Sequence, residues 1–311
     1  MDPRLSKPSA APSDPRTQVR QAHLMLTGKL PSFGDQAIKL VEAACAQKSA
    51  EALLYHAALA ARGHGRPQNL DDAFAYVAEA AALGDTRAKG QLMALGGKLD
   101  REAWFAPVEM RQHHAAPRVF TVDNFLSKPV CAWLMKQAKK NLQPAPVQLA
   151  ARGGAFAVEG SRSNTVAGSH ALQPDLVMQL VNLRIAAAIG APLAQQEPTN
   201  VLHYARGEQY VPHFDFFTEA EEAGFAHELR TIGQRICTVL VYLNDGYEGG
   251  ETDFPRLGWR FKGKPGDALI FWNLSTHGQR EMDSLHAGLP VTKGEKWLLS
   301  KWVRQRPVPL I

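Results

Sequence analysis

The sequence lacks any long hydrophobic run, and none of its apolar stretches approaches the roughly 18 consecutive residues that a membrane-spanning helix needs. The first residues, MDPRLSKPSAAPSDPRTQ, have no apolar core either, so we do not expect a secretory signal. The chain of 311 residues is 45% hydrophobic and 21% charged, a balance typical of soluble globular proteins.

Cysteine is scarce. The chain has three, Cys45, Cys131 and Cys237, which are widely spaced and lie in apolar contexts. An odd number without CxxC spacing argues against both a disulfide framework and a structural zinc site. We therefore expect buried free thiols and, with no secretory signal, a cytoplasmic protein.

Runs of like charge are also absent, although the chain carries a formal net charge of +5. The basic residues are scattered, and no RNP, zinc-finger or helix-turn-helix signature occurs. Nucleic-acid binding is therefore disfavoured, and no membrane partner is expected. A modest basic balance instead suits acidic small molecules or acidic protein partners.

The N-terminal part divides into a tail, a helical region and a connector. Residues 1–20 are rich in Pro, Ser and Ala, which predicts a disordered tail. Residues 21–98 have helical periodicity and internal similarity, because AIKLVEAA (37–44) matches AFAYVAEA (73–80) at a spacing of 36 residues. The region resembles the Sel1-like branch of the tetratricopeptide superfamily, with about two repeats, the first degenerate. A generic Ala-rich helical bundle is the alternative, and residues 99–116 are expected to form a linker.

The residue pattern of the sequence changes at Pro117, where we expect a second domain over residues 117–305. A strand is predicted at 118–125, and helices are predicted at 127–138 and 174–189 from their capping residues. Short strands separated by Gly and Pro then follow, at 200–204, 210–216, 236–243, 250–254, 267–272, 284–290 and 295–304. This series indicates a β-sandwich or barrel, so the predicted class is α+β with a β-core at about 198–305.

The stretch VPHFDFF places two ionisable residues, His213 and Asp215, inside an apolar and aromatic run. On a strand, residues i and i+2 share a face, so both side chains are expected to point inward. Burial of this pair is costly unless something compensates, and a metal ion does so. One more histidine completes the 2-His-1-carboxylate triad that binds Fe(II). Of the downstream histidines His227, His277 and His286, only His286 lies in a strand-like segment, which makes it the better third ligand.

A lysine follows ten residues after His286, in the strand-like segment EKWLLSKWVR. Alternation places Lys296 on one face together with Leu298, Ser300 and Trp302. A lysine among apolar and aromatic neighbours is costly to bury unless it meets an anion. The distal carboxylate of a 2-oxo acid co-substrate is such an anion.

Four segments, taken in order, resemble the prolyl 4-hydroxylase branch of the Fe(II)/2-oxoglutarate dioxygenases. They are the HxD pair (213–215), GGETDFP (249–255), GDALIFWN (266–273) and HAGLPVTKGEKWLLSKWVR (286–304). The similarity begins at RVFTVDNFLSKPVC (118–131). The resemblance implies a double-stranded β-helix (jelly-roll) oxygenase core with supporting helices, preceded here by a small α-helical repeat domain.

The same resemblance implies roles for single residues. It makes His213, Asp215 and His286 the iron ligands, and Lys296 the partner of the distal carboxylate of 2-oxoglutarate. Further residues match positions near the co-substrate or the iron, with ordinary core packing as the alternative; these are Tyr204, Thr238, Tyr242 and Trp302.

Other residues near these motifs are given no role or two possible ones. Glu251 and Asp253 are expected to be structural, because GGETDFP begins a strand in the family. Arg162 and Arg235 either contact substrate or are solvated charges. Residues 216–234, which follow the HxD pair, are expected to form a mobile lid over the mouth of the site.

The resemblance implies an oxidoreductase that uses Fe(II), 2-oxoglutarate and O2, with ascorbate as a further requirement, and releases succinate and CO2. The expected reaction is hydroxylation of a prolyl residue in a peptide or protein, which the helical repeats could recruit. Hydroxylation of a free amino acid or small metabolite is the alternative within the same chemistry. A non-catalytic repeat adaptor is the alternative of another class.

Overall fold

The computed structural model describes residues 14–32, 35–145, 147–149, 155–157, 162–169 and 172–310. These residues divide into two compact units. The helical unit contains the described residues up to Leu99, together with 172–180 and Leu310, and the mixed unit contains the remainder between Asp100 and Pro309. Within the described ranges, no helix is both long enough and apolar enough to cross a membrane.

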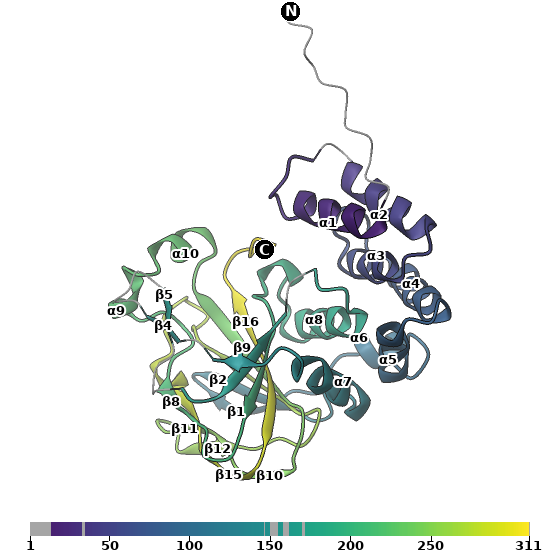
Figure 1. Ribbon diagram of the computed structural model, residues 1–311. Coiled ribbons are helices and arrows are strands. Elements are labelled where there is room, and N and C mark those ends of the chain that lie inside the picture. The colour runs from purple at the N-terminus through teal and green to yellow at the C-terminus, as the bar shows by residue number, and fades with distance from the viewer. Residues whose placement is uncertain are drawn as a thin grey trace, which may run out of the picture. The chain divides into compact units, whose positions relative to one another are not determined.

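The helical unit consists of short helices (Figure 1), which pack through small side chains. Val41, Ala44 and Ala52 are fully buried in its core, which allows neighbouring helices to approach closely. Ala52 and Ala88, which the internal similarity superimposes, are both fully buried on successive helical hairpins. The helices are α1 (Pro15–Leu26), α2 (Gln36–Ala46), α3 (Ala50–Arg62), α4 (Leu70–Ala82) and α5 (Thr86–Ala94).

The helical structure begins earlier than the sequence predicts. Asp14 caps α1 by accepting a hydrogen bond of 2.8 Å from Thr17 N, and Pro15 occupies the first turn. Residues 15–20, predicted to belong to a disordered tail, therefore lie in a helix. The remainder of that predicted tail, residues 1–13, lies outside the described residues.

The predicted linker at 99–116 also contains regular structure. Helix α6 (Arg101–Phe105) is held by Arg184, which donates to the carbonyl oxygens of Ala103 and Trp104 at 2.7 and 2.6 Å. Strand β1 (Arg111–Ala115) pairs with β2 (Arg118–Val122). The sequence does not reveal β1 because RQHHA is a largely exposed edge strand without alternating apolar residues.

Two antiparallel sheets make up most of the mixed unit (Figure 1). Their other strands are β3 (Gln143–Pro144), β6 (Thr165–Gly168), β7 (Asn200–Tyr204), β8 (Tyr210–His213), β9 (Arg235–Tyr242), β11 (Thr252–Phe254), β12 (Trp259–Phe261), β13 (Ala268–Trp272), β14 (His286–Gly288) and β16 (Lys296–Arg304). The large sheet has the order β1-β2-β13-β9-β16-β7-β6-β3, and the small sheet has the order β12-β11-β14-β8. Two short ladders join β4 (Val147–Leu149) to β5 (Ala155–Ala157) and β10 (Tyr247–Gly249) to β15 (Val291–Gly294).

The two sheets share one hydrophobic core. Leu202, Leu240 and Leu298 from the large sheet pack in the same cluster as Phe254 from the small sheet. Helices α7 (Lys128–Ala138) and α8 (Leu176–Ile189) form where the sequence predicts helices. The α+β class with a jelly-roll oxygenase core is therefore confirmed.

Two predicted strands are shorter in the structure. Strand β8 ends at His213, although a strand was predicted over 210–216, and β14 spans 286–288 within the predicted 284–290. The pair His286↔His213 is the last on this side of the ladder, because β14 begins at His286. Without a pairing partner the chain bends after His213, so Asp215 lies outside the sheet.

The segment after the HxD pair is folded rather than an open loop. It contains α9 (Glu219–Glu222) and α10 (Ala226–Thr231), and Thr218 with Glu221 forms a capping box at the start of α9. Phe217 and Phe225 stack with their centroids 4.1 Å apart, and both are buried. Movement of this segment as a lid stays a prediction.

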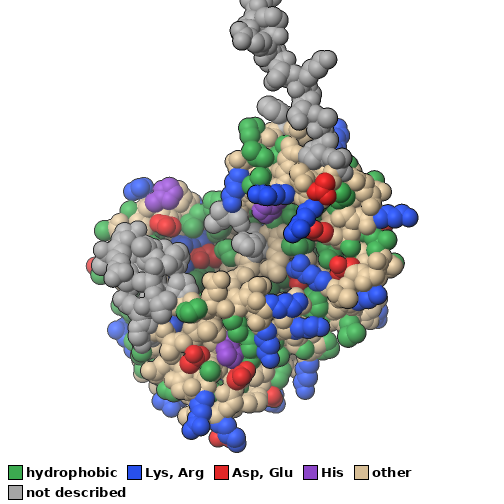
Figure 2. Space-filling view, viewed as in Figure 1, with side chains coloured by type: hydrophobic (Ala, Val, Ile, Leu, Met, Phe, Trp, Pro, Cys, Tyr) green, Lys and Arg blue, Asp and Glu red, His purple; other side chains and the backbone are tan. Residues whose placement is uncertain are grey.

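Charges of both signs are mixed on the surface. On the face shown in Figure 2, Lys and Arg side chains lie among acidic and hydrophobic ones. This distribution follows from the scattered basic residues of the sequence.

Candidate active site

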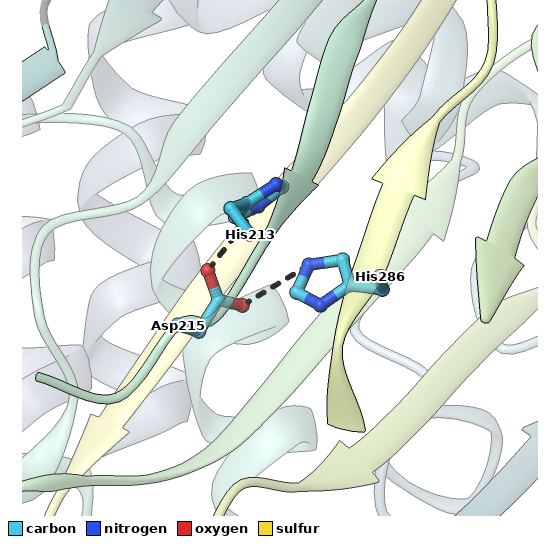
Figure 3. A group of neighbouring side chains, drawn as sticks. All are labelled: His213, Asp215 and His286. Atoms are coloured by element: carbon cyan, nitrogen blue, oxygen red, sulfur yellow. Dashed lines mark ion pairs between the residues drawn. The ribbon is translucent and has the colours of Figure 1, made fainter. Parts of the chain in front are cut away.

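Three residues with metal-binding side chains meet at the open edge of the small sheet. His213 and His286 are register partners on β8 and β14, with ring centroids 4.3 Å apart. Asp215 turns its carboxylate toward both rings (Figure 3), with Oδ1 at 3.8 Å from His213 Nε2 and Oδ2 at 3.6 Å from His286 Nε2. One ligand atom from each residue lies within 4.8 Å of the others. The two histidine-to-carboxylate separations, 3.8 and 3.6 Å, are short enough for one ion bonded to each atom at about 2 Å.

Both imidazoles present Nε2 to the centre of this group. His213 Nδ1 lies 2.9 Å from Val211 O, and His286 Nδ1 lies 3.0 Å from Ser284 O. Because a carbonyl oxygen can only accept, each Nδ1 carries a hydrogen, and Nε2 is the nitrogen that each ring can offer to a metal ion. Burial, and after it the neighbouring His286, lowers the pKa of His213 to about 3, so this ring is neutral at physiological pH. A neutral imidazole is the form that binds a metal ion.

Asp215 is fixed by hydrogen bonds rather than by strand pairing. Thr238 on β9 donates its hydroxyl to Asp215 Oδ2 at 2.6 Å, and Arg235 donates to the backbone oxygen of Asp215 at 3.3 Å. Burial raises the pKa of this carboxyl, but the two histidines and Thr238 outweigh burial and leave the pKa below its usual value. Two imidazole nitrogens and one ionised carboxylate make a donor set that fits Fe(II).

Lys296 is a buried cation in the same part of the molecule. Its side chain is only 1% exposed, and Nζ donates to Gly250 O at 2.7 Å. Nζ also lies 5.2 and 5.6 Å from the ring centroids of Tyr204 and Tyr242. No carboxylate in the described part of the chain forms an ion pair with Lys296. Burial lowers its pKa to about 7 despite the opposing effect of the Glu251 carboxylate, so an anionic ligand would stabilise the charged form.

One cavity joins the His–Asp–His group to Lys296. Tyr204 lines it, and its hydroxyl has no hydrogen-bond partner among the described residues. Burial raises the pKa of Tyr204 to about 12, so the phenol stays protonated and can donate to a ligand. Trp302 Nε1 is a buried donor without a partner in the same described ranges. The other lining residues are Arg162, Asn200, Leu202, Tyr210, Leu240, Thr252, Ala287, Gly288, Leu298 and Ser300.

Thr238 and Tyr242 lie beside this cavity rather than in it. The hydroxyl of Thr238 is engaged with Asp215, and the hydroxyl of Tyr242 lies 2.7 Å from Thr252 Oγ1 and donates to Phe261 O at 3.1 Å. The residue of β9 that lines the cavity is Leu240, between them on the same face. The sequence placed both residues near the co-substrate, with core packing as the alternative; in the structure Thr238 supports Asp215, and Tyr242 ties β9 to the small sheet.

The two arginines of uncertain role are both largely buried. Arg162 is 8% exposed and lines the cavity, with its guanidinium carbon 4.6 Å from the ring centroid of Tyr210. Arg235 forms an ion pair of 2.8 Å with Glu197 and lies 3.6 Å from the ring centroid of Trp302. Neither arginine is a solvated charge. In contrast, His227 and His277 are exposed and lie outside the His–Asp–His group.

Three residues near the site were not predicted from the sequence. The ring of Tyr210 stacks on His213 at 3.5 Å, Asn273 donates to Thr238, and Glu197 pairs with Arg235. Tyr210 is three residues before His213, so strict alternation places the two on opposite faces; an irregularity in the β8–β14 register brings them together. The sequence signal that could have identified such residues is a polar residue at the end of a motif, such as Asn273 in GDALIFWN.

The part of the chain that contains this site is similar to known proteins. Residues 199–304, which contain the His–Asp–His group and Lys296, match the model of the 2OG-Fe(II) oxygenase superfamily. Probable prolyl 4-hydroxylase 6 of Arabidopsis thaliana is 34% identical over 220 residues, covering 64% of this chain and 73% of the relative. Probable prolyl 4-hydroxylase 3 of the same plant is 33% identical over 207 residues, covering 60% and 69%. A solved viral collagen prolyl hydroxylase from Paramecium Bursaria Chlorella virus-1 is 26% identical, with a TM-score of 0.47, and the match covers 60% of this chain and 95% of the viral one.

Proposed function

The chain belongs to the prolyl 4-hydroxylase family of 2-oxoglutarate- and Fe(II)-dependent oxygenases, and we propose that it hydroxylates prolyl residues of a peptide or protein. As a member of this family it is a dioxygenase that uses Fe(II), 2-oxoglutarate and O2. The proposal of a prolyl substrate is supported by the names of the relatives, which cover the same part of the chain as the site.

His213, Asp215 and His286 are the residues that would hold the iron, because their donor atoms converge and both imidazoles offer Nε2. When bound, Fe(II) supplies the oxidative chemistry in which 2-oxoglutarate and O2 yield succinate and CO2, and one oxygen atom enters a C–H bond of the substrate. The protein's own contribution is to orient both substrates and to exclude water from the reacting atoms.

Lys296 is the single observation that carries the proposal. A buried ammonium that forms no ion pair with any described carboxylate lies in the same cavity as a metal-binding group, so the cavity suits a ligand with a carboxylate at its far end. Tyr204 can donate its phenol hydrogen to that carboxylate. Trp302 and Tyr210 line the cavity nearer the histidines, where they would position the substrate and exclude water.

Two finer features complete the proposal. Ascorbate would act as the reductant that keeps the metal in the ferrous state between turnovers. The helical unit would act as Sel1-like repeats that recruit a protein substrate. Its small-residue packing and the equivalent burial of Ala52 and Ala88 support a repeat architecture.

The test is succinate formation by the full chain with Fe(II), 2-oxoglutarate and ascorbate, in air and without oxygen, beside a His213→Ala control. A proline-rich peptide and free proline are offered separately, and mass spectrometry follows the gain of one oxygen atom. Oxygen-dependent hydroxylation of the peptide, lost in the variant, is the expected result. Stimulation by free proline alone would favour a small-metabolite hydroxylase. Equal background in both proteins, with no binding of iron or 2-oxoglutarate by the wild type, would contradict the dioxygenase assignment and favour an adaptor.

A further inference from the structure

We propose that Thr238 and Asn273 are positioning residues of the metal site, forming a relay of hydrogen bonds that presents one carboxylate oxygen of Asp215 to the ion. The proposal rests on the proposed function only in requiring that the His–Asp–His group binds a divalent cation.

The relay is a short chain of buried polar groups. Asn273 Nδ2 donates to Thr238 Oγ1 at 3.0 Å, and Thr238 Oγ1 donates to Asp215 Oδ2 at 2.6 Å. Asn273 and Thr238 are fully buried, and Asp215 is 5% exposed. Buried hydrogen bonds to a charged group are stronger than exposed ones, because no water competes for the donor.

The direction of each hydrogen bond follows from what the groups can do. An amide NH2 only donates and an ionised carboxylate only accepts, so the single hydroxyl hydrogen of Thr238 must point to Asp215. Turning the amide of Asn273 around would offer its oxygen to Thr238, draw the hydroxyl hydrogen away and leave Asp215 without this donor. Asn273 therefore orders Thr238, and Thr238 orders Asp215.

Asp215 needs such support more than the two histidines do. His213 and His286 are fixed by the register of β8 with β14, whereas Asp215 lies in a bend after β8 has ended. Thr238 lies on β9 and Asn273 directly follows β13, neighbouring strands of the large sheet. The relay thus uses the large sheet to hold a ligand that the small sheet cannot hold by pairing.

The relay also distinguishes the two carboxylate oxygens. Oδ2 accepts the hydrogen of Thr238, while Oδ1 has no hydrogen bond within the described ranges. We expect Oδ1 to be the oxygen offered to the cation, which leaves the ion free to bind further ligands. A threonine that only fills space in the core would not make metal affinity depend on its hydroxyl.

The experiment measures Co(II) binding to the full chain by visible absorption, without 2-oxoglutarate, so that no turnover is involved. Thr238→Val removes the hydroxyl but keeps the shape, and should weaken Co(II) affinity by roughly 10- to 100-fold and alter the absorption bands. Thr238→Ser restores the hydroxyl and should return the affinity to within about threefold of wild type. The matched control is Thr121→Val, since Thr121 is another buried threonine of the large sheet but is hydrogen-bonded to His113. It should bind Co(II) as wild type does.

A double-mutant cycle tests the relay itself. Asn273→Leu should weaken Co(II) binding alone, but have no further effect in the Thr238→Val background, because Asn273 acts through Thr238. Additive losses would exclude Asn273 from the relay. Wild-type affinity and spectrum in Thr238→Val, or an equal loss in Thr121→Val, would overturn the proposal. Should Thr238→Val not fold, Asn273→Leu and Thr238→Ser carry the test. A wild-type chain that bound no Co(II) would instead reject the metal site on which the proposed function depends.

Discussion

Lys296 and Tyr204 are register partners in the ladder between β16 and β7, and Lys296 Nζ lies 5.2 Å from the centre of the Tyr204 ring. Both side chains therefore enter the cavity from the large sheet, and strand pairing fixes the separation between them. The ammonium has two aromatic rings and the oxygen of Gly250 around it, but no ion pair with a carboxylate of the described residues. The site is therefore pre-organised for an anionic ligand group. The charge of Lys296 should lower the stability of the ligand-free protein but strengthen the binding of such a ligand.

Replacing Lys296 with Met should make the ligand-free protein more stable while abolishing its response to 2-oxoglutarate. At pH 6 the buried ammonium is charged, and burial, which lowers its pKa to about 7, makes this charge destabilising by several kcal/mol. Removing the charge gains this free energy, offset in part by the lost hydrogen bond to Gly250. Thermal unfolding with and without Mn(II) and 2-oxoglutarate measures both effects. Lys301→Met is the control, since Lys301 is buried on the same strand and donates to Glu197 O. A Lys296→Met protein that 2-oxoglutarate still stabilised would contradict the assigned role.

Affinity for 2-oxoglutarate should fall as the pH rises above neutrality. In the ligand-free protein burial lowers the pKa of Lys296 to about 7, so below pH 7 the side chain already carries the charge that a carboxylate needs. Above pH 7 a proton must be taken up on binding, and the dissociation constant should rise by about tenfold per pH unit. Calorimetric titration of the Mn(II)-loaded protein between pH 6 and pH 9 measures this slope. A flat profile would show that the charge of Lys296 does not contribute.

The residues of β16 that face the cavity could be predicted from the sequence, because side chains alternate between the two faces of a regular strand. Lys296, Leu298, Ser300 and Trp302 all line the cavity, as alternation predicts. The shared inward direction of His213 and Asp215 also follows, although the predicted strand through Asp215 was wrong.

The surroundings of Asp215 could not be predicted in the same way. Thr238 reaches Asp215 because two sheets pack at a particular distance, and that distance depends on core side chains from many strands. Periodicity places a residue on a face, but it does not say which group on the opposite sheet lies across from it. The family resemblance placed Thr238 near the co-substrate, but it did not indicate the hydrogen bond between Thr238 and Asp215.

The tyrosines of the core should behave differently when their hydroxyls are removed. Tyr204→Phe removes a donor that lines the cavity, and should raise the KM for 2-oxoglutarate by about tenfold or more, the value of one hydrogen bond to a charged group. Tyr242→Phe removes the contacts with Thr252 and Phe261, and should lower the free energy of unfolding by about 1 kcal/mol with little change in KM. Steady-state kinetics and urea unfolding of both variants separate the two roles. A large KM effect in Tyr242→Phe would instead assign the hydroxyl of Tyr242 to the binding of 2-oxoglutarate.

The helical unit provides the last prediction, which concerns substrate recruitment. Leu83 at the end of α4 and Met93 on α5 are 43% and 79% exposed, although both are large apolar side chains. If this surface docks a protein substrate, the double change Leu83→Glu with Met93→Glu should lower kcat/KM for a whole-protein substrate by about fivefold or more, the effect of losing about 1 kcal/mol of docking free energy. The short peptide containing the same proline should be hydroxylated at the wild-type rate, because it reaches only the cavity of the mixed unit. Unequal effects on the two substrates support recruitment by the repeats. Equal effects would mean that the helical unit contributes to stability alone.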